Sequence, residues 1–117
     1  MNNFSNVIHE LALLFGINNY VLQDQNTASF SIGNDILTVD AYANGIFVSV
    51  SRPISQFEMY KLENALAHCD SKYSAYPIRV GTHQDKIIMT AVLSHSDSTP
   101  QTILKVYDYI TVLHNGI

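Results

Sequence analysis

The sequence predicts an α+β domain in which helices pack on an antiparallel sheet, in the element order α-β-β-β-α-β-β-α. Three segments repeat their apolar residues at helical spacing. The segments between them are short apolar runs, several of which alternate with polar residues as strands do. Clusters of Gly, Asn and Asp separate these runs. Residues 1–117 make one domain, since domains usually contain about 100–150 residues.

The composition excludes several classes of protein. Of the residues, 47% are hydrophobic and 14% charged, the opposite balance to a disordered chain. No apolar run is long enough to span a membrane, and no basic region precedes the first apolar stretch, which argues against a secretory signal. The single cysteine, Cys69, indicates a reducing compartment, so we expect a cytoplasmic protein. A net charge of −4 argues against binding nucleic acid.

The first helix is expected over Asn3–Phe15, with Gly16 placed to end it. Its apolar stripe consists of Phe4, Val7, Ile8, Leu11, Leu14 and Phe15. Leu13 falls off this stripe. The helix is therefore more apolar than one core-facing side requires, which indicates contact with a second partner.

A meander of three strands follows, over Ala28–Ile32, Ile36–Tyr42 and Ile46–Val50. Gly33-Asn34-Asp35 predicts the first turn. Asn44-Gly45 predicts a two-residue type I′ hairpin, because both residues tolerate positive φ.

The second helix is expected to start at a capping box made by Ser55 and Glu58 and to run to about Cys69. Its apolar stripe consists of Met59, Leu62, Ala65, Leu66 and Cys69. Two strands then occupy Tyr76–Gly81 and Lys86–Ser94, joined by the turn His83-Gln84-Asp85. The second of these strands is almost continuously apolar, which predicts that both its faces are covered.

The last helix starts at Thr99, with Pro100 at its first position, and ends at Asn115-Gly116. Its predicted buried stripe consists of Ile103, Val106, Tyr107, Ile110 and Leu113.

No motif for catalysis, metal or cofactor binding is present, so we expect no enzyme, no metal site and no cofactor. The five histidines lack ligand spacing and are expected at the surface. Cys69 lies on an apolar stripe, which favours an inert core thiol. The single acidic residues suit turns and caps, and the basic residues are scattered as isolated surface charges.

Aromatic residues gather around the second helix, where they could form core or a dimer interface. They are Phe47, Phe57, Tyr60, Tyr73 and Tyr76. A core this small cannot easily hide every apolar residue, so a dimer interface is the second interpretation.

The whole chain resembles a class I type III secretion chaperone. The resemblance rests on its length, acidity and element order, and on an N-terminal helix that ends at Leu14-Phe15-Gly16-Ile17. It also rests on the hydrophobic meander, the middle helix between Pro53 and Cys69, and the last helix ending Leu113-His114-Asn115-Gly116-Ile117. The family lacks a catalytic signature, so these marks are topological.

The resemblance implies a non-enzymatic, dimeric chaperone of the bacterial cytoplasm. Such chaperones bind the N-terminal region of a secreted effector, translocator or gatekeeper protein without ATP and keep it secretion-ready. The bound segment adds strands or inserts apolar side chains into grooves. The chain lacks an acidic tail after the last helix, which leaves open a smaller subtype that forms heterodimers and serves the gatekeeper. Homodimer and heterodimer both remain open.

Two candidate surfaces follow. The partner is expected in a groove with Leu11, Leu14 and Phe15 on one side and Phe30 and Ile32 on the other, and Leu13 is its best probe. The dimer is expected around the second helix and the strand after it, through Phe57, Tyr60, Asn64, Tyr76 and Ile78.

Two other functions remain open from the sequence. One is a small α+β regulatory or ligand-binding module unrelated to secretion. The other is a hydrolase or transferase that uses Cys69.

Overall fold

The computed structural model describes residues 3–22, 24–55, 58, 60–69 and 77–116. Its elements are α1 (Asn3–Leu14), β1 (Thr27–Ile32), β2 (Asp35–Tyr42), β3 (Gly45–Pro53), α2 (Tyr60–Cys69), β4 (Ile78–His83), β5 (Lys86–Leu93), a short 3₁₀ turn η2 (His95–Asp97) and α3 (Pro100–Asn115). The α+β class and the predicted order of helices and strands are confirmed.

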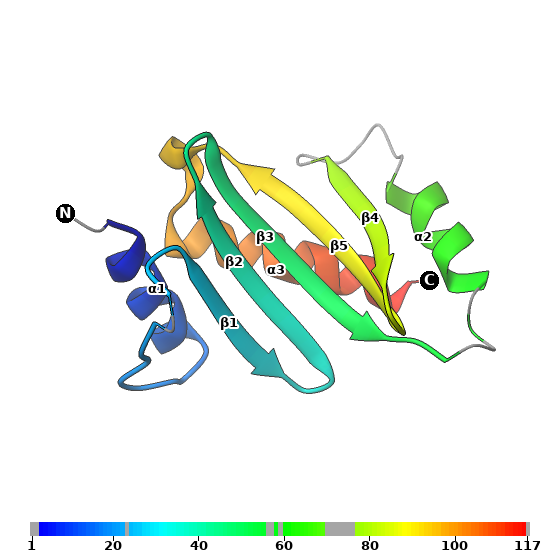
Figure 1. The fold of residues 1–117 in the computed structure, drawn as a ribbon, viewed down its shortest axis with the longest axis horizontal. Coiled ribbons are helices and arrows are strands. Elements are labelled where there is room, and N and C mark those ends of the chain that lie inside the picture. The colour runs from blue at the N-terminus through cyan, green and yellow to red at the C-terminus, as the bar shows by residue number, and fades with distance from the viewer. Residues whose placement is uncertain (1–2, 23, 56–57, 59, 70–76, 117) are drawn as a thin grey trace.

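The five strands form one antiparallel sheet in the order β1-β2-β3-β5-β4. Figure 1 shows α3 crossing behind the sheet, α1 beside β1 and α2 beside β4. Helix α3 packs against β3 and β5 and also contacts both other helices. Strands β1 and β4 are the two edges of the sheet.

The core lies between the sheet and α1 and α3. Its fully buried side chains include Ile8, Leu11, Leu37, Val39, Val48, Val50, Ile87, Met89, Leu93, Ile103, Val106 and Ile110. Along each central strand, buried residues alternate with less buried ones, as expected when one face of a sheet is packed.

The prediction that the strand Lys86–Ser94 is covered on both faces is wrong for this chain. Its buried residues alternate with Ile88 and Thr90, which are half-buried, and Val92, which is exposed. The apolar residues Ile88 and Val92 lie on the less buried face, which is why the sequence of this strand is almost continuously apolar. The helices of this chain therefore leave that face of β5 uncovered.

The predicted end of the first helix is confirmed. Gly16 adopts φ +79°, and its N–H donates to the Leu13 carbonyl at 2.9 Å. The next N–H, that of Ile17, donates to the Ala12 carbonyl at 2.9 Å. This pair of bonds is a Schellman motif, which requires a left-handed residue that glycine supplies at least cost.

The hairpin predicted at Asn44-Gly45 forms one residue earlier. Tyr42 pairs with Gly45, so the two turn residues are Ala43 and Asn44. Neither of them has a positive φ, so the type I′ prediction is wrong. Gly45 is the first residue of β3. This position requires glycine because a Cβ there would collide with the carbonyl oxygen of Leu93 on β5. The glycine serves a close approach between strands and not the turn itself.

The capping box predicted before the second helix forms only in part. The Glu58 carboxylate accepts hydrogen bonds from the N–H and the hydroxyl of Ser55, at 3.3 and 3.1 Å, whereas the Glu58 N–H donates to the Ser55 carbonyl at 3.0 Å. The regular helix starts later, at Tyr60. The predicted start of the last helix, with Pro100 at its first position, is confirmed. Thr99 caps this helix, because its side chain accepts from the N–H of Thr102 at 3.1 Å.

Candidate functional site

An apolar hollow lies between α1 and the segment that follows it, and we call it the α1 hollow. Its volume is about 440 Å³, and it is lined by His9, Leu13, Ile17, Asn19, Tyr20 and Val21. The side chains of Leu13 and Val21 are 58% and 78% exposed. Leu14, next to Leu13, is also exposed. Aliphatic side chains gathered in this way mark a surface that a partner can cover.

Aromatic contacts hold the segment after α1 against the sheet. The Tyr20 ring stacks on Phe30 of β1 with ring centroids 4.7 Å apart. Phe15 packs on the same Phe30 at 5.7 Å and meets Tyr107 of α3 edge-on at 5.4 Å. Asn19 takes φ +58° just before Tyr20, which asparagine tolerates better than most residues. These contacts hold that wall of the hollow in place while no partner is bound.

The groove expected between the first helix and the early strands is filled. Phe15 contacts Phe30 directly, so no space separates the two predicted sides. Leu11 and Phe30 belong to the core and offer a partner almost no surface. Leu11 and Phe30 are apolar because they form the core. The periodicity of the sequence cannot distinguish a core residue from one that binds a partner.

The remaining predicted partner residues lie at different places. Leu13 and Leu14 are exposed, and Phe15 is half-buried against the core. Ile32 is half-buried at the far end of β1, where it lines another hollow. The structure thus brings Leu13 to the α1 hollow and separates Ile32 from it. Sequence reasoning missed Val21 and Tyr20, because no periodic pattern marks a loop.

The predicted dimer residues are only partly described. Tyr60, the first residue of α2, is 58% exposed, and Asn64 is exposed on the same helix. Ile78 is buried in the core, because the β4 register places it opposite Ala91 on the packed face, so it offers a second copy little surface. Phe57 and Tyr76 lie outside the described residues. The dimer stays a prediction.

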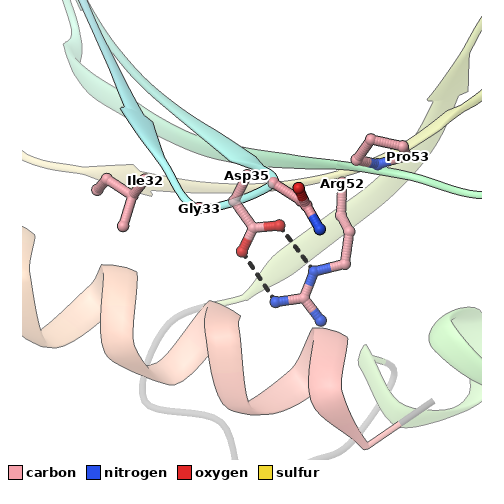
Figure 2. Close-up of a pocket in the computed structure, with 6 residues that line it drawn as sticks. Ile32, Gly33, Asp35, Arg52 and Pro53 are labelled. Carbon is pink, nitrogen blue, oxygen red and sulfur yellow. Dashed lines mark hydrogen bonds and ion pairs between the residues drawn. The ribbon is translucent and has the colours of Figure 1, made fainter.

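A second hollow, of about 600 Å³, lies at the end of the β1–β2 hairpin and is lined by Ile32, Gly33, Asn34, Asp35, Arg52 and Pro53 (Figure 2). Arg52 Nε and Nη2 donate to the two carboxylate oxygens of Asp35 at 2.7 and 2.8 Å. Its Nη1 donates to Asn115 Oδ1 at 2.7 Å. The Asp35 hydrogen bond raises the pKa of Arg52 against the opposing effect of burial. The prediction that the basic residues are isolated surface charges is therefore wrong for Arg52, which joins β2, β3 and α3.

His114 also contradicts the expectation that every histidine is a surface residue. Its side chain is buried, and its Nε2–H donates to the Val50 carbonyl at 2.9 Å, since a carbonyl can only accept. Burial lowers the pKa of His114, the Val50 bond opposes this, and the charge of Arg52 lowers it further. His9, His83 and His95 are exposed, as expected. The imidazole of His114 is therefore a neutral structural donor near pH 7.

Within the described residues, no three His, Cys, Asp or Glu side chains come together in a group that could bind a metal ion. The side chain of Cys69, proposed as an inert core thiol, lies outside the described part of the chain. Among the described segments, no helix combines the length and apolar character that crossing a bilayer requires.

Comparison with solved structures identifies the fold. The type III secretion chaperone SycH of Yersinia pestis, in complex with a stable fragment of YscM2, matches with a TM-score of 0.74 at 12% identity, over 97% of this chain and 98% of that one. A chain of the heterodimeric ExoU–SpcU complex from the type III secretion system of Pseudomonas aeruginosa matches with a TM-score of 0.59 at 14% identity, over 93% and 90%.

A third structure, the E. coli candidate transcription regulator YbjN, matches with a TM-score of 0.54 at 10% identity, over 93% of this chain and 95% of that one. No protein-family model and no curated sequence matches the chain. The chain has the fold of type III secretion chaperones, which confirms the resemblance in fold, and a regulator candidate shares it.

Proposed function

We propose that this chain is a cytoplasmic type III secretion chaperone. It binds the N-terminal region of a secreted effector, translocator or gatekeeper protein and keeps that region secretion-competent without ATP. It works as a homodimer or as a heterodimer with a similar small chaperone, and it performs no catalysis.

The observation that carries this proposal is the α1 hollow on a chaperone fold. Leu13 and Val21 expose most of their side chains beside a hollow of about 440 Å³, although the same chain buries a complete core elsewhere. Apolar surface that folding does not need is available to a partner. The fold is the one in which SycH is found with a fragment of YscM2.

The proposed binding is passive and apolar. Covering Leu13 and Val21 removes apolar area from water at roughly 25 cal/mol per Å². The partner segment loses chain entropy on binding, so it must cover a large area. Because few charges take part, affinity tolerates salt. It also survives a chelator and alkylation of Cys69, because neither a metal nor a thiol takes part.

A regulatory module remains the second candidate, because YbjN shares the fold over almost the whole chain. If the chain has that function, the exposed side chains of Leu13 and Val21 do not bind a secreted protein. The net charge of −4 argues against direct contact with DNA, so such a module would act through protein or ligand contacts.

Co-expression tests the proposal. The tagged chain is produced with the secreted protein encoded beside its gene, and the complex is isolated in buffer with EDTA and without nucleotide. We expect the two proteins to co-purify and the N-terminal region of the secreted protein to resist a protease only within the complex. Absence of a complex with every neighbouring secreted protein contradicts the proposal, as does a complex that forms only when EDTA is left out.

A further inference from the structure

The outer edge of β1 carries an unusual contact with a tyrosine hydroxyl. The Tyr20 hydroxyl accepts a hydrogen bond from the Ser29 N–H at 3.1 Å and donates one to the Ser29 carbonyl at 2.9 Å. One side-chain group thus satisfies both polar groups of a single strand residue.

The register of the hairpin explains why these groups are available. Ile32 pairs with Asp35 across a two-residue loop, and residues that flank such a loop exchange hydrogen bonds. Because hydrogen-bonded and non-hydrogen-bonded pairs alternate in an antiparallel ladder, Ser29 opposite Thr38 is a non-hydrogen-bonded pair. Its N–H and carbonyl therefore point away from β2, and those of Thr27 and Ser31 do so by the same alternation.

An exposed row of outward backbone groups is a template for a further strand. The other edge, β4, has α2 packed beside it (Figure 1). The edge of β1 has the Tyr20 hydroxyl, which makes the two bonds that an added strand would make to Ser29. At Ser29, the middle one of the three residues with outward backbone groups, Tyr20 thus occupies the place of an added strand.

We propose that Tyr20 guards the β1 edge and that an extended partner segment displaces it. This inference rests on the proposed function, since it identifies how a partner enters the α1 hollow. The segment pairs with Thr27, Ser29 and Ser31 in the manner of an added strand, and the Tyr20 hydroxyl leaves Ser29 as it arrives.

The surroundings define the side chains of this segment. The Tyr20 ring stacks on Phe30 at 4.7 Å, and Phe30 is only 2% exposed with the ring in place. The displacing segment therefore presents an apolar or aromatic side chain to Phe30. The opposite face of the segment, beside the exposed side chain of Ser29, suits polar residues. The partner is thus a strand of alternating apolar and polar residues.

The test uses Tyr20→Phe, which keeps the ring on Phe30 and removes only the hydroxyl. Tyr42→Phe is the matched control, because Tyr42 is an exposed tyrosine that packs on Phe47 elsewhere on the sheet. The probe is a short fluorescein-labelled peptide of alternating valine and threonine, used beside an analogue N-methylated on its pairing face. Hydrogen exchange of backbone amides reports the edge in the free protein.

We expect Tyr20→Phe to speed exchange of the Ser29 amide and to bind the peptide about tenfold more tightly than the parent chain, because no hydroxyl competes with the peptide for the Ser29 N–H and carbonyl. The N-methylated peptide should bind at least tenfold more weakly than the parent peptide. Bound peptide should protect Thr27, Ser29 and Ser31. Equal affinity of Tyr20→Phe and the parent chain, or protection at β4 instead, would overturn the inference.

These readouts are independent of any secreted protein. If no secreted protein co-purifies while the peptide results hold, only the proposed function fails. If a secreted protein co-purifies while Tyr20→Phe behaves like Tyr42→Phe, only the guard role of Tyr20 fails.

Discussion

Phe15, the residue directly after α1, packs on Phe30 of β1 with ring centroids 5.7 Å apart. Because Phe15 also meets Tyr107 of α3 at 5.4 Å, one ring ties a helix, a strand and a second helix together. This arrangement fixes α1 with Leu13 facing outward. The helical wall of the α1 hollow is therefore preformed, and a partner that binds there need not order α1 first.

Gly45→Ala should destabilise the fold by about 2 kcal/mol, because the new methyl group meets the Leu93 carbonyl oxygen and the strands must move apart. Gly81→Ala is the matched control, since no atom lies within 4 Å of a Cβ built there. It should be neutral or slightly stabilising. Urea unfolding measures both, and equal stabilities for the two variants would contradict the close approach of β3 and β5.

Arg52→Met should lower the free energy of unfolding by about 2–3 kcal/mol, because it leaves the buried Asp35 carboxylate without its cation. Urea unfolding is again the measurement. Adding Asp35→Asn to Arg52→Met should recover part of the loss, because the unpaired charge is then removed. A double variant no more stable than the single one would show that the ion pair is not the cause.

Stability should fall as the pH drops below about 6.5, the ordinary pKa of histidine. Burial lowers the pKa of His114 in the folded state, so the unfolded chain binds a proton first as the solution is acidified. Proton binding stabilises the unfolded chain relative to the folded one. Above that pH the neutral imidazole contributes its full stability. Urea unfolding from pH 7.5 to 5 measures the slope.

His114→Gln is the control for this pH dependence. Its side-chain amide can still donate to Val50 but does not titrate, so the slope should flatten. An unchanged slope in His114→Gln would assign the pH dependence to other groups.

The sequence predicted the order of elements well because apolar periodicity and glycine-rich turns are local signals. It failed where a residue's role depends on distant partners. Arg52 and His114 look like surface residues until β3 and α3 meet, and Gly45 looks like a turn residue until β5 lies beside it. The candidate site had the same difficulty. Leu13 was found because it breaks the stripe, whereas Tyr20 acts through a loop that no pattern identifies.

Tyr60→Glu should convert the proposed dimer into a monomer, because it places a charge in a contact from which water is excluded. Tyr60 is 58% exposed in the single chain, so the substitution should leave the fold of each copy intact. Light scattering gives the mass. Tyr42→Glu, which introduces the same charge at another exposed tyrosine, should leave the dimer unchanged, and a dimer that survives Tyr60→Glu would exclude this interface.

The affinity of the co-purifying secreted protein for Leu13→Asp, measured by titration calorimetry, tests the account most directly. Leu13 lines the α1 hollow and is 58% exposed, so the variant should fold normally and bind at least tenfold more weakly, a loss of about 1.4 kcal/mol or more. Val112→Asp is the control, because Val112 is 65% exposed on α3 and does not line the hollow; it should bind like the parent chain. A folded Leu13→Asp chain with undiminished affinity would contradict the account.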